Sequence, residues 1–199
     1  MKSIIVLSQS ELKKNAVQNI FPHYEYDITF VNVPDNPNRE SQPLFENGTK
    51  TACNQRISEF LATNPTILEN TFILSIENGI SIFDISVEEI MLRKLADCDW
   101  SDICFCGLLA PNGTKTFFLS PVIIEIDRKY SGPFFLYHYH NQHSDCDTLG
   151  KYIAKHGKTK THPKIPHNNW MKIIAGIDRV EQIKFGLEKV KKFIDSYSL

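Results

Sequence analysis

The sequence predicts an α/β protein built on a mixed twisted sheet with flanking helices. The first half alternates strand-like apolar runs with segments of helical periodicity, which favours parallel strands joined by helices. Further along, two strand-like runs flank an Asn-Gly turn, which favours an antiparallel section. With 199 residues, 42% of them hydrophobic, the chain can bury a sizeable core without disulfides or a structural metal. It holds no repeat or long linker, so we expect one domain over residues 1–199.

The first strand and helix are predicted at the N-terminus. Ser3–Leu7 is apolar on both faces, which is typical of a buried central strand. Ser8–Glu11 has the S-x-x-E form of a capping box, so the helix is expected to begin there. Apolar residues then recur at helical spacing, at Leu12, Ala16 and Ile20.

A second strand and a second helix follow. Tyr26–Val33 alternates well enough for a strand, and Pro34–Pro43 holds three prolines and two asparagines, which predicts a loop. A helix is predicted over Thr49–Leu61 from the spacing of its apolar residues.

The remaining elements complete the mixed pattern. Thr71–Ile76 and Ile80–Ile85 are predicted as two strands around Glu77-Asn78-Gly79. Ile103–Leu109 and Thr116–Leu119 flank Pro-Asn-Gly, a strong hairpin signal. The chain closes with a long amphipathic helix, whose apolar residues are Val180, Ile183, Leu187, Val190 and Ile194.

Charge and cysteine content exclude several classes of function. Lys and Arg total 22 against 23 Asp and Glu, a net charge of -1, so we expect neither nucleic acid nor a membrane as partner. No stretch approaches the roughly 18 apolar residues of a membrane span. Five cysteines without paired spacing suit a reducing compartment, and the apolar run Ile4–Leu7 is too short for a signal peptide. The expected location is the cytoplasm.

The junction Ser8–Lys14 between the first strand and helix is the first candidate site. A helix N-terminus presents free N–H groups and a partial positive charge, which favour phosphate. Hydroxyls, an amide and lysines could supplement them, at Ser8, Gln9, Ser10 and Lys13. The alternative is a plain cap with lysines on a solvated face.

Glu77 is the second candidate. It is expected at the end of an apolar strand, where the crevice of a parallel sheet would open. A carboxylate there suits Mg²⁺, a hard ion that takes carboxylate and phosphate oxygens together. The alternative is a tight turn with Glu77 exposed and idle.

A histidine-rich stretch, Tyr137–Asp147, is the third candidate. Three histidines, a thiol and two acids lie close together there, but their spacing fits no familiar zinc motif. A solvated polar loop is the favoured interpretation, and the same holds around His156, His162 and His167.

Several motifs occur together in a recognisable order. They are Ser8-Gln9-Ser10-Glu11-Leu12-Lys13, Gln42-Pro43, Thr49-Lys50-Thr51-Ala52-Cys53-Asn54-Gln55-Arg56, Ile76-Glu77-Asn78-Gly79-Ile80, Phe118-Leu119-Ser120-Pro121, Asp147-Thr148-Leu149-Gly150 and Ala175-Gly176-Ile177-Asp178-Arg179. In this order the chain resembles the inosine/xanthosine triphosphatase family, which is related in fold to the inosine triphosphate pyrophosphatases.

The resemblance implies two lobes around a cleft and hydrolysis of non-standard purine nucleoside triphosphates (ITP, XTP and their deoxy forms) as nucleotide house-cleaning. It also implies Mg²⁺ or Mn²⁺ as cofactor and a homodimer. On this basis substrate contacts are expected from Ser8, Gln9, Ser10, Lys13, Arg56 and Arg179, either arginine having a structural role as its alternative. The implied metal ligands are Glu77, which is also the catalytic residue, Glu46 and Asp35.

The chain also departs from the family pattern. The threonines and asparagine of the phosphate loop are replaced. The acidic pair that follows Gln-Pro in the family is reduced here to one acidic residue, in Glu46-Asn47-Gly48. Two alternatives therefore stay open. One is a family member with weakened catalysis that acts as a nucleotide-binding or interaction protein, and the other is an unrelated α/β domain.

Overall fold

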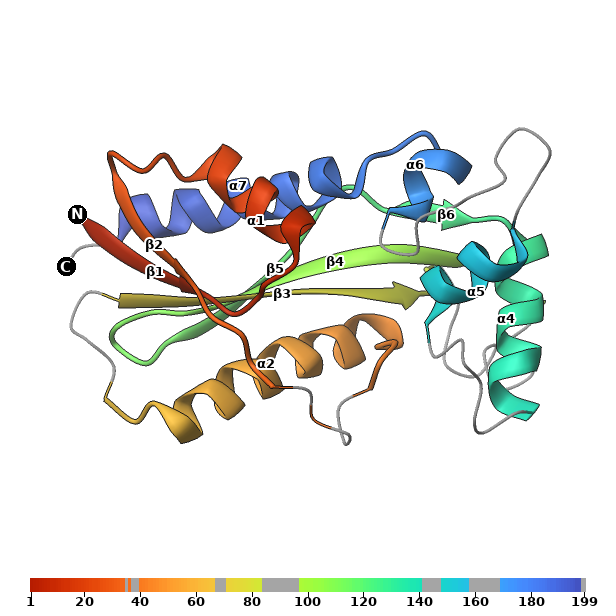
Figure 1. Ribbon diagram of the computed structural model, residues 1–199, viewed down its shortest axis with the longest axis horizontal. Coiled ribbons are helices and arrows are strands. Elements are labelled where there is room, and N and C mark those ends of the chain that lie inside the picture. Colours follow the sequence, from red (N-terminus) through yellow and green to blue (C-terminus); the bar gives the residue numbers. More distant parts are fainter. Residues whose placement is uncertain are drawn as a thin grey trace.

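The computed structural model describes residues 1–34, 36, 40–66, 71–83, 97–140, 148–157 and 169–197, with the backbone alone at 136–140. Its sheet has the strand order β2-β1-β3-β4-β5, with β6 also paired to β4 (Figure 1). The strands are β1 (Lys2–Val6), β2 (Tyr26–Phe30), β3 (Thr71–Ser81), β4 (Trp100–Leu109), β5 (Lys115–Leu119) and β6 (Ile124–Ile126). The helices are α1 (Glu11–Ile20), α2 (Phe45–Thr63), α4 (Arg128–His140), α5 (Leu149–His156), α6 (Trp170–Ile174) and α7 (Arg179–Ser196).

The sheet is mixed, as the sequence predicts. β1 pairs in parallel with both β2 and β3, whereas β4 pairs antiparallel with β3, β5 and β6. β1 lies inside the sheet, and Ile4 and Val6 are fully buried. The predicted hairpin between β4 and β5 is confirmed, with Gly113 at φ +83° in its turn.

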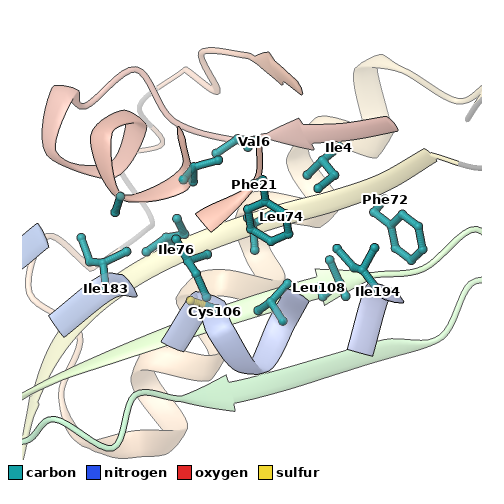
Figure 2. Packing of buried hydrophobic residues seen from close by; sticks show 14 of the residues in the cluster. Ile4, Val6, Phe21, Phe72, Leu74, Ile76, Cys106, Leu108, Ile183 and Ile194 are labelled. Atoms are coloured by element: carbon teal, nitrogen blue, oxygen red, sulfur yellow. The ribbon is translucent and has the colours of Figure 1, made fainter. Parts of the chain in front are cut away.

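Helices cover both faces of the sheet (Figure 1). On one face α1 and α7 lie side by side, and Figure 2 shows the cluster that they bury, in which Val6, Leu74 and Ile183 meet. α2 covers the other face, where Ile57 packs against Ile73 and the neighbouring strand ends. Burial on both faces is why the central strands are almost continuously apolar.

A smaller lobe sits at one end of the sheet, formed by β6, α4, α5 and α6 (Figure 1). Its core is aromatic: Trp100 stacks on Phe135 with ring centroids 4.1 Å apart, and Trp170 is buried in the same cluster. β3 and β4 run from the larger lobe into this one. The expected arrangement of two lobes is therefore observed.

The predicted capping box at Ser8–Glu11 is wrong. α1 begins at Glu11 with Ser10 as the N-cap residue, and the Ser10 side chain does not cap the helix. Ser8 instead accepts a hydrogen bond on Oγ from the Ser10 N–H at 3.2 Å, while its own N–H bonds the Val6 carbonyl. Ser8 and Ser10 belong to the connection between β1 and α1, so the helix begins later than the motif indicates.

The boundaries of two other elements also differ from the sequence prediction. The strand expected over Tyr26–Val33 ends at Phe30, because its parallel partner β1 ends at Val6. The helix expected from Thr49 begins at Phe45, a residue with φ +60°, at the point where the chain leaves the edge of the sheet.

The separation into two strands predicted around Glu77-Asn78-Gly79 is also wrong, and so is the expected position of Glu77 at a strand end. β3 runs unbroken through these residues, which pair with Phe105, Cys104 and Ile103 of β4. Gly79 is needed for a different reason. A Cβ there would lie 2.0 Å from Thr49 Oγ1 and 2.9 Å from the Pro43 carbonyl oxygen. The glycine lets α2 approach the strand closely.

Candidate functional site

An opening in the edge of β3 defines the site. β1 pairs with β3 only as far as Leu74, and the Leu7 N–H bonds the Leu74 carbonyl. Farther along the same edge, the Pro43 carbonyl accepts from the Ile80 N–H at 3.0 Å. Between these points the strand edge has no backbone partner among the described residues, and the Ile76 carbonyl accepts a hydrogen bond from Lys13 Nζ.

A cavity of about 220 Å³ opens at this edge, where the two lobes meet. α1, β3, β4 and α7 line it from the larger lobe, and α5 and α6 from the smaller one. The lining residues are Ser10, Leu12, Lys13, Ser41, Gln42, Glu77, Asn78, Asp102, Thr148, Leu149, Gly150, Trp170, Arg179 and Ile183. Polar groups from several elements therefore converge on one concave surface, as in a small-molecule site.

Glu77 lies between two cations that come from different helices. Its Oε1 accepts a hydrogen bond from Arg56 Nε of α2, and its Oε2 lies 3.6 Å from Lys13 Nζ of α1. All three side chains are largely buried, with between 12% and 18% of their surface exposed. Glu77 is thus at the meeting point of the two helical layers.

Asp102 is the second carboxylate in the cavity. Its Oδ2 accepts a hydrogen bond from Arg179 Nη2 at 2.9 Å, and its Oδ1 accepts from Gln182 Nε2 at 3.1 Å. Gln182 in turn accepts on Oε1 from Asn78 Nδ2 at 3.0 Å. Burial raises the pKa of Asp102, an effect that Arg179 opposes only in part.

The structure brings together four of the residues named from the sequence. Ser10, Lys13, Glu77 and Arg179 line the cavity, whereas Arg56 is not among the lining residues and donates a hydrogen bond to Glu77.

The other predicted site residues lie elsewhere or outside the described chain. Ser8 is buried against the Ser10 N–H, and the exposed Gln9 donates to the Phe30 carbonyl at 2.9 Å. Glu46 lies 3.6 Å from Lys50 and is not among the residues that line the cavity. Asp35 falls outside the described residues.

No group of three or more potential metal ligands (His, Cys, Asp or Glu) converges anywhere in the described part of the chain. The histidine-rich candidate Tyr137–Asp147 lies mostly outside it: its first four residues end α4, and 141–147 are not described. His162 and His167 also fall outside. His156 packs on Tyr152, with ring centroids 4.6 Å apart. None of the helices that the structure describes is long and apolar enough to cross a membrane.

Sequence reasoning missed Asp102 and Gln182. Both stand within otherwise apolar patterns: Asp102 lies in β4, which is buried at every position, and Gln182 lies on the buried face of α7. A lone polar residue on an apolar face was the available signal, because buried polar groups need partners and commonly mark functional sites.

Comparison with known proteins supports the fold. No protein-family model and no curated protein matches the chain. The solved structure of protein VC0702 from Vibrio cholerae is 15% identical, covers 98% of this chain and 96% of its own, and has a TM-score of 0.60. This near-complete match confirms a mixed α/β fold.

Partial matches are found as well. The Ham1 protein of Staphylococcus aureus is 17% identical over 64% of this chain and 73% of its own, with a TM-score of 0.39. The nucleoside-triphosphatase, or dITP/XTP pyrophosphatase, of Mycobacterium abscessus is 13% identical over 63% and 75%, with a TM-score of 0.37.

Proposed function

We propose that this chain is a divalent-metal-dependent nucleoside-triphosphate phosphatase that acts on ITP, XTP and their deoxy forms. The observation that carries the proposal is the meeting of Lys13 and Glu77 in one cavity, beside the start of α1. A cation and a carboxylate placed together suit a ligand that combines phosphate with a metal ion. The motif resemblance supplies the class of substrate.

The start of α1 is the proposed phosphate end of the cavity. The Ser10 side chain does not cap the helix, so N–H groups of its first turn would be open to an anion, and the helix dipole favours negative charge there. The Ser10 hydroxyl and Lys13 ammonium line the cavity beside it. Together they would hold phosphate oxygens.

The residues present fit a metal ion that arrives with the nucleotide. Mg²⁺ is usually held by one or two carboxylates together with substrate phosphates and water, so a cage of three protein ligands is not required. Glu77 supplies the carboxylate, and Glu46 and Asp35 stay proposed as further ligands. The bound ion would neutralise charge as phosphate leaves.

The chain's own residues divide the remaining work. Lys13 Nζ lies 3.6 Å from Glu77 Oε2, and incoming phosphates would draw the ammonium away from the carboxylate. Arg56 continues to hold Glu77 Oε1 and so keeps the side chain aimed at the cavity. A carboxylate oriented in this way can also position an attacking water.

The test is a panel of standard and deaminated triphosphates with Mg²⁺ or Mn²⁺, in which orthophosphate and pyrophosphate are measured separately. We expect release from ITP and XTP that stops when EDTA removes the metal. Failure to hydrolyse any triphosphate with either metal would contradict the proposal.

A catalytically weakened nucleotide-binding protein is the second candidate. It is favoured by the position of Glu77, whose two oxygens both face cations, in a chain whose described residues hold no cluster of three metal ligands. Saturable binding of ITP without metal-dependent phosphate release would select this alternative.

Cytoplasmic location and a homodimer complete the proposal. Cys53, Cys104 and Cys106 are buried and form no disulfide among the described residues, which suits a reducing compartment. Light scattering on the purified protein measures the oligomeric state.

A further inference from the structure

We propose that Asn112 is a site of spontaneous deamidation, at which water converts the side-chain amide into aspartate and isoaspartate. The inference does not depend on the proposed function. The sequence holds three Asn-Gly pairs, at Asn47, Asn78 and Asn112. The fold places them in a helix, in a central strand and in an exposed turn, and the turn leaves its asparagine most open to the reaction.

The reaction takes place within the chain itself and needs no partner other than water. The backbone nitrogen of the residue after asparagine loses its proton to hydroxide and attacks the side-chain Cγ. The amide nitrogen takes a proton from water and leaves as ammonia. Water then opens the cyclic succinimide at either carbonyl, which gives aspartate or, with the main chain running through Cγ, isoaspartate. Glycine favours the attack, because it carries no Cβ and its backbone turns most freely.

Asn112 lies in the turn that joins β4 to β5, at the end of the sheet opposite the smaller lobe (Figure 1). Asn112, Gly113 and Thr114 are all exposed. The Gly113 N–H donates to the Ala110 carbonyl at 2.9 Å, and an added Cβ on Gly113 would meet no described atom beyond its chain neighbours within 4 Å. Breaking that exposed hydrogen bond frees the attacking nitrogen, and surface turns of this kind open at low cost in free energy.

The turn also prepares the carbon that is attacked. Asn112 Oδ1 accepts a hydrogen bond from the Thr114 N–H at 3.0 Å, which folds the side chain back over its own turn. Negative charge develops on this oxygen as the backbone nitrogen adds to Cγ. A backbone N–H already directed at the oxygen stabilises that charge and so favours the attack.

Asn78 is protected by the centre of the sheet. It lies in β3, where it pairs with Cys104 of β4, and its Nδ2 donates to Gln182 Oε1 at 3.0 Å. The neighbouring Gly79 is buried, and a Cβ on it would lie 2.0 Å from Thr49 Oγ1. The Gly79 nitrogen therefore reaches Asn78 Cγ only after β3 has separated from its neighbours, which requires the core to unfold.

Asn47 is the intermediate case, because it is exposed but helical. It lies in the first turn of α2, where backbone N–H groups point along the helix axis and side chains point outward. This turn is held by Thr49, which is fully buried and donates from Oγ1 to the Phe45 carbonyl at 2.9 Å. Reaction at Asn47 therefore requires the start of the helix to unwind first.

Deamidation of Asn112 would change the surface where the hairpin meets the C-terminal end of α7. The Asn112 backbone N–H donates to Tyr197 Oη at 3.3 Å. Aspartate adds a negative charge there and can keep the hydrogen bond from Thr114, whereas isoaspartate also lengthens the main chain and shifts both contacts. None of the described residues that line the cavity belongs to this turn, so the site is separate from the proposed active site.

The first test follows the unaltered protein during incubation at neutral and at mildly alkaline pH. Enzymatic methylation with a labelled methyl donor detects isoaspartate, and mass spectrometry of peptides prepared in acid locates each converted asparagine. We expect conversion at Asn112 to be at least about 100-fold faster than at Asn78, whose exposure requires the free energy of unfolding, with Asn47 in between. The rate should rise with pH, because hydroxide removes the proton from the attacking nitrogen.

Two comparisons show whether the fold causes the difference. In urea the three asparagines should react at similar rates, because each then precedes an unconstrained glycine. N112Q should lose the fast reaction, since glutamine would have to close a larger ring, and the matched variant N47Q should keep it. Thermal melting checks that both variants fold, and if N112Q does not, the comparison of the folded and urea-unfolded protein decides.

Three results would overturn the inference. They are equal rates at the three pairs in the folded protein, an intact Asn112 under conditions in which the protein in urea is converted, and an unchanged fast reaction in folded N112Q. None of these measurements involves a triphosphate. The outcome is therefore independent of whether ITP is hydrolysed.

Discussion

Glu77 and Asp102 lie in the same cavity and each is paired with an arginine, yet the two pairs are built differently. Glu77 is contacted by two long side chains from separate helices, Arg56 of α2 and Lys13 of α1. Asp102 lies on the opposite face of the sheet, and its arginine and glutamine partners both come from the first turns of α7.

The Lys13–Glu77 pair is therefore exchangeable, whereas the Asp102–Arg179 pair is fixed. Lys13 carries its charge on a flexible stem, so its contact with Glu77 can be replaced when a stronger ligand arrives. Asp102 is only 4% exposed, and its carboxylate accepts hydrogen bonds from Arg179 and Gln182. An exchangeable carboxylate suits chemistry, and a fixed one suits recognition.

The fixed pair should give the largest effect on stability. Arg179→Met leaves a buried carboxylate without its cation, which typically costs about 3–5 kcal/mol. Urea unfolding at pH 8, where Asp102 is most ionised, measures the loss. Arg128→Met removes the cation of the exposed Asp99 pair and should not measurably change stability. Similar values for the two variants would show that the Asp102 pair is not special.

The exchangeable pair should give the largest effect on activity. Glu77→Gln keeps the size of the side chain but removes the charge that a hard cation requires, and should lower the rate by about two decades or more. Phosphate release from ITP with Mg²⁺ is the measurement. Glu181→Gln, which alters an exposed ion pair with Lys184, is the control. Full Mg²⁺-dependent activity in Glu77→Gln would refute the metal role of Glu77.

Substitution of Gly79 tests how much the close packing of α2 against β3, beside Glu77, contributes to stability. Gly79→Ala forces a Cβ against Thr49 and the Pro43 backbone and should destabilise the protein by about 1–3 kcal/mol. Gly48→Ala is the control, because its Cβ would meet ordinary contacts of 3.8 Å and 3.9 Å within a helix, where alanine is favoured. Denaturant midpoints for both variants should move in opposite directions.

Lys13 should give the smallest effect of the four. Lys13→Ala should lower kcat/KM for triphosphates about tenfold, the loss of one charge-assisted hydrogen bond to phosphate. Stability should change little, since Arg56 still pairs with Glu77. Lys184→Ala, on the exposed side of α7, serves as the control. Kinetics equal to those of the unaltered protein would reduce Lys13 to a structural partner of Glu77.

Local patterns predicted the elements whose structure depends on nearby residues. The hairpin around Gly113 follows from its turn residues, and α7 follows from its apolar spacing. The predicted capping box at Ser8 and the predicted separation of two strands at Asn78-Gly79 are wrong because long-range partners override short motifs. Pairing with β4 keeps β3 extended through Asn78, and the path out of β1 uses Ser8.

The sequence by itself therefore determined the α/β class, the buried first strand and the position of Lys13 near the start of a helix. Only the tertiary structure placed Glu77 beside Arg56 and Lys13, since β1 had to end early to open the edge of β3. It alone paired Asp102 with Arg179, which is 77 residues away in the chain. Contacts of that kind depend on strand register and on the position of α7 against the sheet, and short-range propensities encode neither.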